Sequence, residues 1–482
     1  EARAALGRGD RDAAVGALRG AVEAYERARA RIGAAPLDAF FVDERAWAYD
    51  ALARALTEAG EVDEALAVID RIKARAFTEA LLGDRAGDRG PDGMPTRRMV
   101  ERAANLRRLR APSARRGPGQ VPADVAILEA YLLPDAMLLF WTLGGRTVGR
   151  VVPGDREAVE RDADALLAAV REGGAEWRAP AQALAGRLIE PFVGQLTGRA
   201  APRALAVIPH GALHQVPFAL LPLGDSLLVD RLPVFSAPNR TALREAFSDP
   251  PPTPPRSVVA VGDPLGDLPG ARAEVREVAQ LFSRSVVLAG ADAIEGSVRR
   301  ALADADVLHF AVHGVRATRG SPAYLELQPD AGHDGRLHAD ELATLRLAAR
   351  LVVLSVCDSA RGRPNRGDEI VGVVDRAFLL GGARSVIASR WPVHDAASVL
   401  FMRALYQGLF REDLLSAFHH AQLALRHGDL LPATLGDGVV ATLGTSRSAV
   451  FRGVRPARFG RTAQDFTHPY FWAAFTLRGD PR

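Results

Sequence analysis

A single cysteine and a histidine, each at the end of an apolar run, are the residues best suited to chemistry in this chain of 482 residues. Cys357 is the only cysteine, and it directly follows the apolar run 351–356. His313, followed by Gly314, ends a second apolar run at 307–312. A thiolate is a nucleophile, and an imidazole can take up the thiol proton and later pass it to a leaving amine. This pair of groups predicts a cysteine peptidase.

The elements that must position the two groups are buried strands. Both runs are short and continuously apolar, which favours strands of a mostly parallel sheet covered by helices on both faces. Functional sites in such α/β sheets form beyond the carboxyl ends of the strands. We therefore expect the thiol and the imidazole at one edge, where the backbone N–H groups of Gly314 and Cys357 would bind the oxyanion of the reaction.

Other uses of these residues stay open. A cysteine flanked by apolar residues is usually a core residue, and a lone histidine at a strand end is usually structural. A zinc site is a further alternative, with ligands drawn from His309, His313, His333, His338 and Asp340. The absence of a second cysteine disfavours it. The sequence has no Walker-type loop and no dinucleotide fingerprint, so we expect neither a metal nor a cofactor.

Composition sets broad limits on the function. With 48% hydrophobic and 25% charged residues and no apolar run near the ~18 residues of a membrane span, the chain reads as globular. Its net charge of +3 is too small to indicate a nucleic-acid partner, and all basic residues except Lys73 are arginine. One cysteine cannot form an internal disulfide, which predicts a reducing, cytoplasmic setting. The start at Glu1, without Met or a signal segment, suggests further sequence upstream.

The first 124 residues are predicted to form a helical segment and a linker, unlike the α/β pattern of the rest. Residues 1–85 are helical in period, and the pair 47–56 and 63–70 on either side of Gly60 resembles one tetratricopeptide repeat. An ordinary helical hairpin that caps the next domain is the alternative. Residues 86–124 form an Arg/Gly/Pro-rich linker. Its stretch 97–116 could touch RNA or an acidic partner, but without aromatic residues a solvated helix face is favoured.

Two α/β units follow, separated by the stiff proline run 250–255. In the first unit, 125–249, a long helical segment is expected over 156–196, among strands at 126–132, 136–141, 146–152, 204–210 and 228–234. In the second unit, 256–482, the expected strands are 257–262, 285–288, 307–312, 351–356 and 385–389. Helices are expected between them at 272–282, 293–303 and 371–380.

Several stretches of the two units together resemble the CHAT domain, a caspase-like peptidase module that is often joined to tetratricopeptide repeats in bacteria. They are 208–218, 268–274, 308–314, 335–342, 352–359, 367–372, 377–395 and 468–475. The resemblance implies a fold related to separase and caspase, with a mostly parallel sheet and helices on both faces. It also implies an inactive-like half at 125–249 and a catalytic half at 256–482.

The resemblance assigns roles to single residues. Cys357 would be the nucleophile, His313 the general base and acid, and Gly314 an oxyanion donor. Ser355, two positions before the nucleophile, would line the pocket for the P1 side chain, where an acid often signals a basic P1 residue. The remaining pocket candidates are Asp358, Asp263 and Asp395, which would supply negative charge, and Trp391, either as a pocket wall or as a core residue.

The resemblance also implies a biological setting. CHAT proteins are implicated in bacterial defence and regulated cell death, where a partner switches them on and they cut one protein, such as a gasdermin-like pore former. We therefore expect an endopeptidase activated by a protein or ligand, with 361–367 as either a mobile element or an arginine-rich surface turn. The alternatives are a catalytically silent scaffold and a subunit of an RNA-linked complex that uses 97–116.

Overall fold

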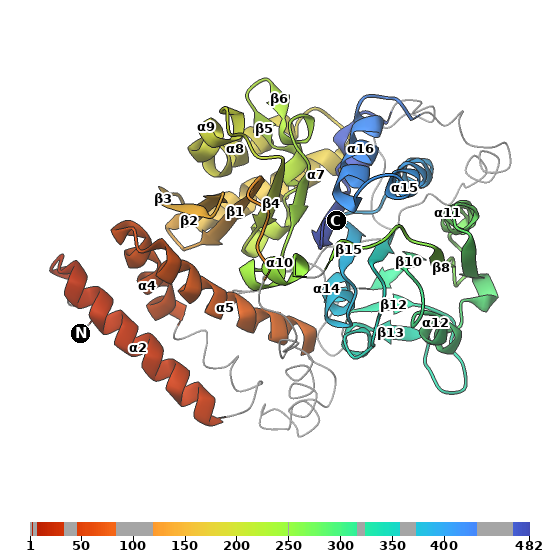
Figure 1. Ribbon diagram of the computed structural model, residues 1–482, viewed down its shortest axis with the longest axis horizontal. Coiled ribbons are helices and arrows are strands. Elements are labelled where there is room, and N and C mark those ends of the chain that lie inside the picture. The colour runs from red at the N-terminus through yellow and green to blue at the C-terminus, as the bar shows by residue number, and fades with distance from the viewer. Residues whose placement is uncertain are drawn as a thin grey trace.

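The protein is built around one large sheet (Figure 1). The computed structural model describes residues 2, 7–32, 46–82, 119–248, 250–315, 323–356, 373–430 and 466–482. Within them, 11 strands form the order β3-β2-β1-β4-β7-β16-β15-β14-β10-β8-β9. Their bounds are β1 Val125–Leu132, β2 Ala136–Leu143, β3 Arg146–Pro153, β4 Ala204–Ile208, β7 Val234–Ser236, β8 Ser257–Gly262, β9 Arg284–Ala289, β10 Val307–Ala311, β14 Leu351–Leu354, β15 Ser385–Ser389 and β16 Phe475–Gly479.

Most strands of this sheet are parallel, which confirms the expected α/β class. The run β9-β8-β10-β14-β15 is parallel throughout, as are the pairs β1–β4 and β4–β7. The exceptions are the antiparallel meander β1-β2-β3 and the strand β16, which is antiparallel to β15. Parallel strands that follow one another need crossover connections, and the helix α11 Pro269–Gln280 makes the one between β8 and β9.

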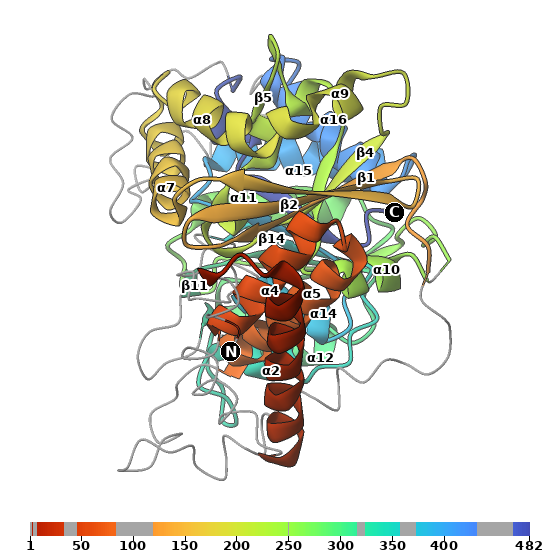
Figure 2. The same cartoon turned by 90° about the vertical axis from the view of Figure 1, so that its left-hand side faces the viewer.

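Helices cover both faces of the sheet, as Figure 2 shows for α8, α15 and α16 on one side and α5, α12 and α14 on the other. In β10, Val307 and Ala311 belong to one buried cluster, whereas Leu308 and Phe310 belong to the other, as the two-residue period of a strand requires. The helices of the two units are α7 Arg156–Glu172, α8 Arg178–Leu188, α9 Val193–Thr197, α10 Arg240–Ala246, α11 Pro269–Gln280, α12 Glu295–Ala301, α13 Ala339–Leu342, α14 Val373–Leu380, α15 Asp395–Leu409, α16 Leu414–Arg426 and α18 Pro469–Trp472.

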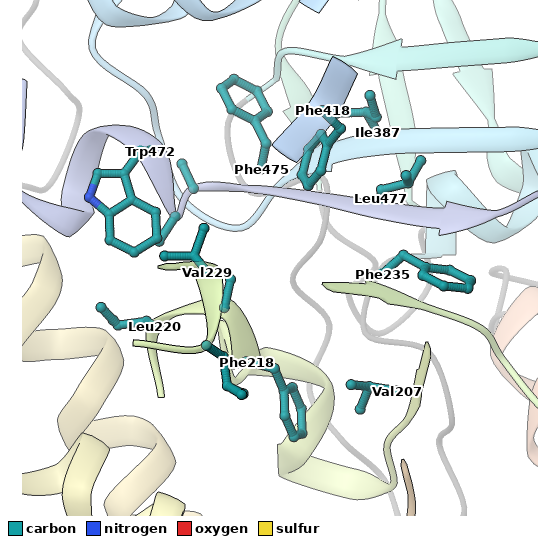
Figure 3. Packing of buried hydrophobic residues seen from close by; sticks show 14 of the residues in the cluster. Val207, Phe218, Leu220, Val229, Phe235, Ile387, Phe418, Trp472, Phe475 and Leu477 are labelled. Carbon is teal, nitrogen blue, oxygen red and sulfur yellow. The ribbon is translucent and has the colours of Figure 1, made fainter. Parts of the chain in front are cut away.

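The two halves expected on either side of 250–255 share one sheet and the buried cluster on one of its faces. β16, from the end of the chain, lies between β15 and β7, and Arg478 pairs with Ser236. Figure 3 shows Phe475 and Leu477 of β16 between side chains of both halves. All of these apolar residues belong to the same buried cluster, so the two halves bury this face of the sheet together.

Two expected elements differ in the structure. The strand expected over 228–234 is wrong: Leu228–Asp230 is a turn of 3₁₀ helix, and β7 begins only at Val234. The Asp230 carboxylate accepts a hydrogen bond from the N–H of Leu227 at 2.9 Å, which favours the turn, and Pro233 has no N–H to give a ladder. The single helical segment over 156–196 is also wrong, because Gly173, in the left-handed region with φ 81°, ends α7.

The N-terminal helices are consistent with a TPR-like segment and also cover one face of the sheet. They are α2 Arg11–Ile32, α4 Ala46–Ala59 and α5 Val62–Leu82. Gly60, with φ 80°, makes the turn between α4 and α5. Leu56 and Ile69 of this hairpin belong to one buried cluster with Leu138 and Phe140 of β2. Among the described helices, none is both long and apolar enough to cross a membrane.

Candidate active site

His313 lies just beyond the carboxyl end of β10, and its imidazole faces a carboxylate. Its Nε2 is 3.0 Å from Oδ1 and 3.2 Å from Oδ2 of Asp267. Its backbone carbonyl accepts a hydrogen bond from the N–H of Glu326 at 2.9 Å, which fixes the chain where it leaves the sheet. The His313 side chain is 30% exposed and that of Asp267 is 50% exposed. The ring is therefore held in place and still open to solvent.

Asp267 is a functional candidate that the sequence analysis missed. It stands in the loop between β8 and α11, and β8 is the direct neighbour of β10 in the sheet. A carboxylate that accepts from one ring nitrogen sets the orientation of an imidazole and stabilises its protonated form. The available signal was the position of an acid shortly after a buried strand, at the edge where His313 was expected. Three other acids after strands share that pattern in this chain, so the signal alone does not select Asp267.

Cys357 and Asp358 lie outside the described residues. On the approach to Cys357 the described chain is fixed to both neighbouring strands. The N–H of Ser355 donates to the carbonyl of Phe310 in β10 at 2.8 Å, and the carbonyl of Val356 accepts from the hydroxyl of Ser389 in β15. The residue just before the expected nucleophile is therefore part of the ordered, buried end of the sheet.

Gly314 opens a small second sheet directly after His313. It belongs to β11, Gly314–Val315, which pairs antiparallel with β12, Tyr324–Glu326, and through it with β13, Arg336–His338. Gly314 pairs with Leu325, which is fully buried. The backbone at the expected oxyanion donor is thus held by a ladder rather than by a loop alone.

Ser355 is buried, and its hydroxyl is bonded inside the protein. Its Oγ is 3.0 Å from Oγ of Ser398 on α15, which in turn donates to Oε2 of Glu274 on α11 at 2.7 Å. Ser355 retains 9% of its exposed area. Its expected place beside the P1 side chain stays a prediction, and its hydroxyl already has a partner.

Asp263 directly follows β8 and anchors the loop that carries Asp267. Its Oδ1 accepts from the N–H of Leu268 at 2.7 Å, and its Oδ2 is 2.7 Å from Nη2 of Arg272. Asp263 is buried and has a φ of 48°, in the left-handed region that aspartate tolerates better than most residues. Its carboxylate therefore already has two partners, one in the loop and one on α11.

Asp395 begins α15 and lies against the start of α11. A Cβ added to Gly270 would come within 2.2 Å of the Asp395 Cγ, so only glycine fits there without movement. Burial, followed by the charge of Glu274, raises the pKa of Asp395 to about 6. The environment of the Asp395 carboxyl group therefore disfavours its charged form.

Trp391 is a core residue in this structure. Its side chain is fully buried, its Nε1 donates to the carbonyl of Tyr470 at 2.9 Å, and the two rings are stacked. A ring with no exposed area forms no pocket surface here. Of the two roles expected for Trp391, the geometry fits the core role.

The histidines of the zinc alternative point to separate partners. Nε2 of His309 is 3.0 Å from Glu274, whereas Nδ1 of His333 is 2.8 Å from Asp330. In the part of the chain that the structure describes, no three His, Cys, Asp or Glu side chains are grouped in a way that could hold a metal ion. The chemistry of the described edge is therefore that of an imidazole and a carboxylate.

Two proteins of similar sequence match part of this chain. Tetratricopeptide repeat protein 28 of Mus musculus is 28% identical over 362 residues, which are 62% of this chain and 13% of that protein. Its Homo sapiens counterpart is 27% identical over 359 residues, with the same coverage. The match thus spans about an eighth of the length of these relatives.

Similarity of fold extends further along the chain. A structure of the Saccharomyces cerevisiae separase–securin complex matches 98% of this chain and 38% of its own, with a TM-score of 0.52 and 12% identity, which shows likeness of fold. The model of the CHAT domain family matches residues 178–480. Because that match spans more than half of the chain, this chain belongs to the CHAT domain family.

Proposed function

We propose that this protein is a cysteine endopeptidase in which Cys357 is the nucleophile and His313 is the general base and acid. The register of two strands carries the proposal. Each residue of β14 is 44 positions after its partner in β10 (351 − 307 and 354 − 310). Cys357 follows His313 by the same 44 positions (357 − 313). Because adjacent strands lie about 4.8 Å apart, continuing this register supports a thiol and an imidazole side by side.

The proposed reaction uses both nitrogens of the His313 ring. Nε2 faces Asp267, so Nδ1 is the atom that takes the thiol proton. The Cys357 sulfur then attacks the carbonyl carbon of the peptide bond, and the N–H groups of Gly314 and Cys357 stabilise the oxyanion, each by about 3 kcal/mol. The imidazolium protonates the amine as the C–N bond breaks. Water, deprotonated by His313, hydrolyses the thioester and restores the thiol.

For the substrate side, Ser355 and the acids Asp263, Asp358 and Asp395 stay candidates. Asp395 has the strongest support among the described ones, because its partly buried carboxyl group has an environment that raises its pKa to about 6, whereas Asp263 is already paired with Arg272. A basic substrate group beside it would favour its charged form. The substrate itself is proposed to be one specific protein, and a gasdermin-like protein is an example by family likeness.

We also propose that a partner or ligand switches the activity on. The support is the position of the TPR-like hairpin: α5 contacts both α13 and α14, and α14 is the helix that follows residues 357–372 in the chain. A partner that binds the N-terminal helices would therefore act on an element next to the proposed nucleophile. A role in bacterial defence or regulated cell death is part of this proposal and rests on family likeness.

Labelling with a thiol-directed peptide probe tests the proposal. Since Cys357 is the only cysteine, every label on the intact chain reports this residue. We expect labelling of the wild type that is lost in Cys357→Ala and at least tenfold slower in His313→Ala. A proteome-wide search for new protein termini, comparing wild type with Cys357→Ala, would then identify the substrate. Equal labelling of wild type and His313→Ala would favour the silent scaffold.

A further inference from the structure

A buried side-chain network lies under the edge that carries His313, and Glu274 of α11 is at its centre. Oε1 of Glu274 is 3.0 Å from Nε2 of His309 in β10. Oε2 accepts a hydrogen bond from the hydroxyl of Ser398 in α15 at 2.7 Å. Glu274 is 3% exposed and His309 and Ser398 are no more exposed than that. Both carboxyl oxygens are thus bonded to side chains from two different elements.

The network continues in both directions. On one side, Nδ1 of His309 is 2.9 Å from the hydroxyl of Tyr406. Burial, followed by the charge of Glu274, raises the pKa of Tyr406 well above its usual value, so its hydroxyl keeps its proton. On the other side, Oγ of Ser398 is 3.0 Å from Oγ of Ser355. The network therefore spans β10, α11, α15 and the residue that follows β14.

The donors of the network all point toward Glu274. A carboxylate oxygen accepts, so Nε2 of a neutral His309 ring carries the proton and donates it to Glu274, and Nδ1 then accepts from the hydroxyl of Tyr406. Ser398 donates to Glu274 with its only hydroxyl proton, so it must accept the proton of Ser355. A carboxylate at position 274 accepts at both oxygens and so gives every side chain of the network a hydrogen-bond partner. A side chain that donates at this position would leave one buried donor facing another donor.

The two ends of the network have a specific relation to the proposed catalytic pair. His309 of β10 is four residues before His313, which lies just beyond the end of that strand, and Ser355 is two residues before Cys357. The backbone ladder between β10 and β14 sets the spacing of the strands. The network adds a second connection between the ends of β10 and β14, which runs through side chains of α11 and α15. These contacts fix the two helices against both strand ends. Small displacements at such a site change proton transfer strongly.

We propose that Glu274 is a positioning residue for the Cys357–His313 pair: it holds the end of β10 and the end of β14 in the relative placement that proton exchange between thiol and imidazole requires. This inference rests on the proposed function. Glu274 touches no reacting atom of the proposed reaction. It acts on the catalytic pair only through its contacts, with His309 on one side and with Ser398 and Ser355 on the other.

The pH dependence of alkylation of the single cysteine by iodoacetamide tests the inference without any substrate. In wild type, an imidazole beside the thiol shifts the midpoint of the rate profile below the ordinary thiol value of about 8.5. Glu274→Gln keeps the shape and introduces a donor. We expect its midpoint to move up by about one pH unit and its rate at pH 7 to fall roughly tenfold. Ser398→Ala removes the bonds of Ser398 to Glu274 and to Ser355 and keeps the contact between Glu274 and His309. It should move the rate in the same direction by about threefold.

Glu129→Gln is the matched control. Glu129 is a fully buried carboxylate on β1 that also bonds side chains of two other elements, Lys73 and Arg240. Glu129→Gln should lower the unfolding temperature and leave the pH dependence of Cys357 alkylation unchanged. Glu274 is not a positioning residue if Glu274→Gln and Ser398→Ala both keep the wild-type profile, or if Glu129→Gln moves it equally. A wild-type profile in His313→Ala would instead contradict the proposed function, whatever Glu274→Gln does.

Discussion

Lys73 and Glu129 form a fully buried ion pair that fastens the N-terminal hairpin to the sheet. Nζ of Lys73, on α5, is 2.9 Å from Oε1 of Glu129, on β1, and neither side chain has exposed area. Arg240 of α10 binds the other oxygen at 2.6 Å. Burial alone would raise the pKa of Glu129, but the charges of Lys73 and Arg240 outweigh it and lower that pKa. The only lysine of the chain thus lies at a junction of three segments.

Replacing Lys73 should weaken this junction. Because Arg240 still neutralises Glu129, we expect Lys73→Met to lower the free energy of unfolding by roughly 3 kcal/mol, the lower end for one partner of a buried pair. Urea denaturation measures it. Arg54→Ala is the control, since Arg54 and Asp135 join the same hairpin to the same sheet at 2.7 Å but are 39% and 67% exposed. Its effect should stay below about 1 kcal/mol, and equal losses in the two variants would contradict this view of the junction.

Asp70, one helical turn before Lys73, should make stability depend on pH. Burial, followed by the charge of Glu129, raises the pKa of Asp70 from 3.8 to about 6. The folded state therefore binds a proton that the unfolded state releases, and the resulting destabilisation grows as the pH rises from about 4 to about 6. Asp70→Asn removes this destabilisation, so we expect the free energy of unfolding to rise by roughly 1–3 kcal/mol at pH 7.5 and not at pH 4. Urea denaturation at both pH values checks this, and equal gains would point to a cause other than titration.

The strands that carry the site were predictable because they are buried on both faces. The runs 307–312 and 351–356 are apolar except for His309 and Ser355, and the structure has β10 and β14 there. The partners of the histidines were not predictable in the same way. Glu274 stands in an expected helix, but its contacts to His309 and Ser398 join residues 35 and 124 positions apart. Such pairs depend on how helices settle on the sheet, which no local pattern encodes.

The strand prediction over 228–234 failed because a side chain there bonds the backbone. The run 228–234 has the composition of a strand, yet the carboxylate of Asp230 bonds the backbone three residues earlier and turns the chain. Side chains that compete with the ladder for backbone N–H groups override propensity in short segments. The same rule explains Asp263, whose bond to the N–H of Leu268 shapes the loop that presents Asp267.

Asp267 should contribute to the rate through His313. We expect Asp267→Ala to slow labelling of Cys357 by the peptide probe by about tenfold, less than for the buried carboxylate of a serine peptidase triad because this pair is partly in water. Asp225→Ala, which removes an exposed carboxylate from the turn between β5, Pro222–Leu223, and β6, Ser226–Leu227, is the control and should leave the rate unchanged. A wild-type rate in Asp267→Ala would mean that the contact seen here does not orient the ring.

Asp263 can act in two ways that a double-mutant cycle separates. As an anchor, it binds the N–H of Leu268 and Arg272 and so holds Asp267 in front of His313. As a pocket acid, it would attract the substrate directly. Asp263→Gly removes the carboxylate and keeps a backbone suited to its φ of 48°. If Asp263 is an anchor, Asp263→Gly should slow probe labelling by up to tenfold in the wild type and have little further effect in Asp267→Ala. Effects that multiply in the double variant would assign Asp263 to the pocket.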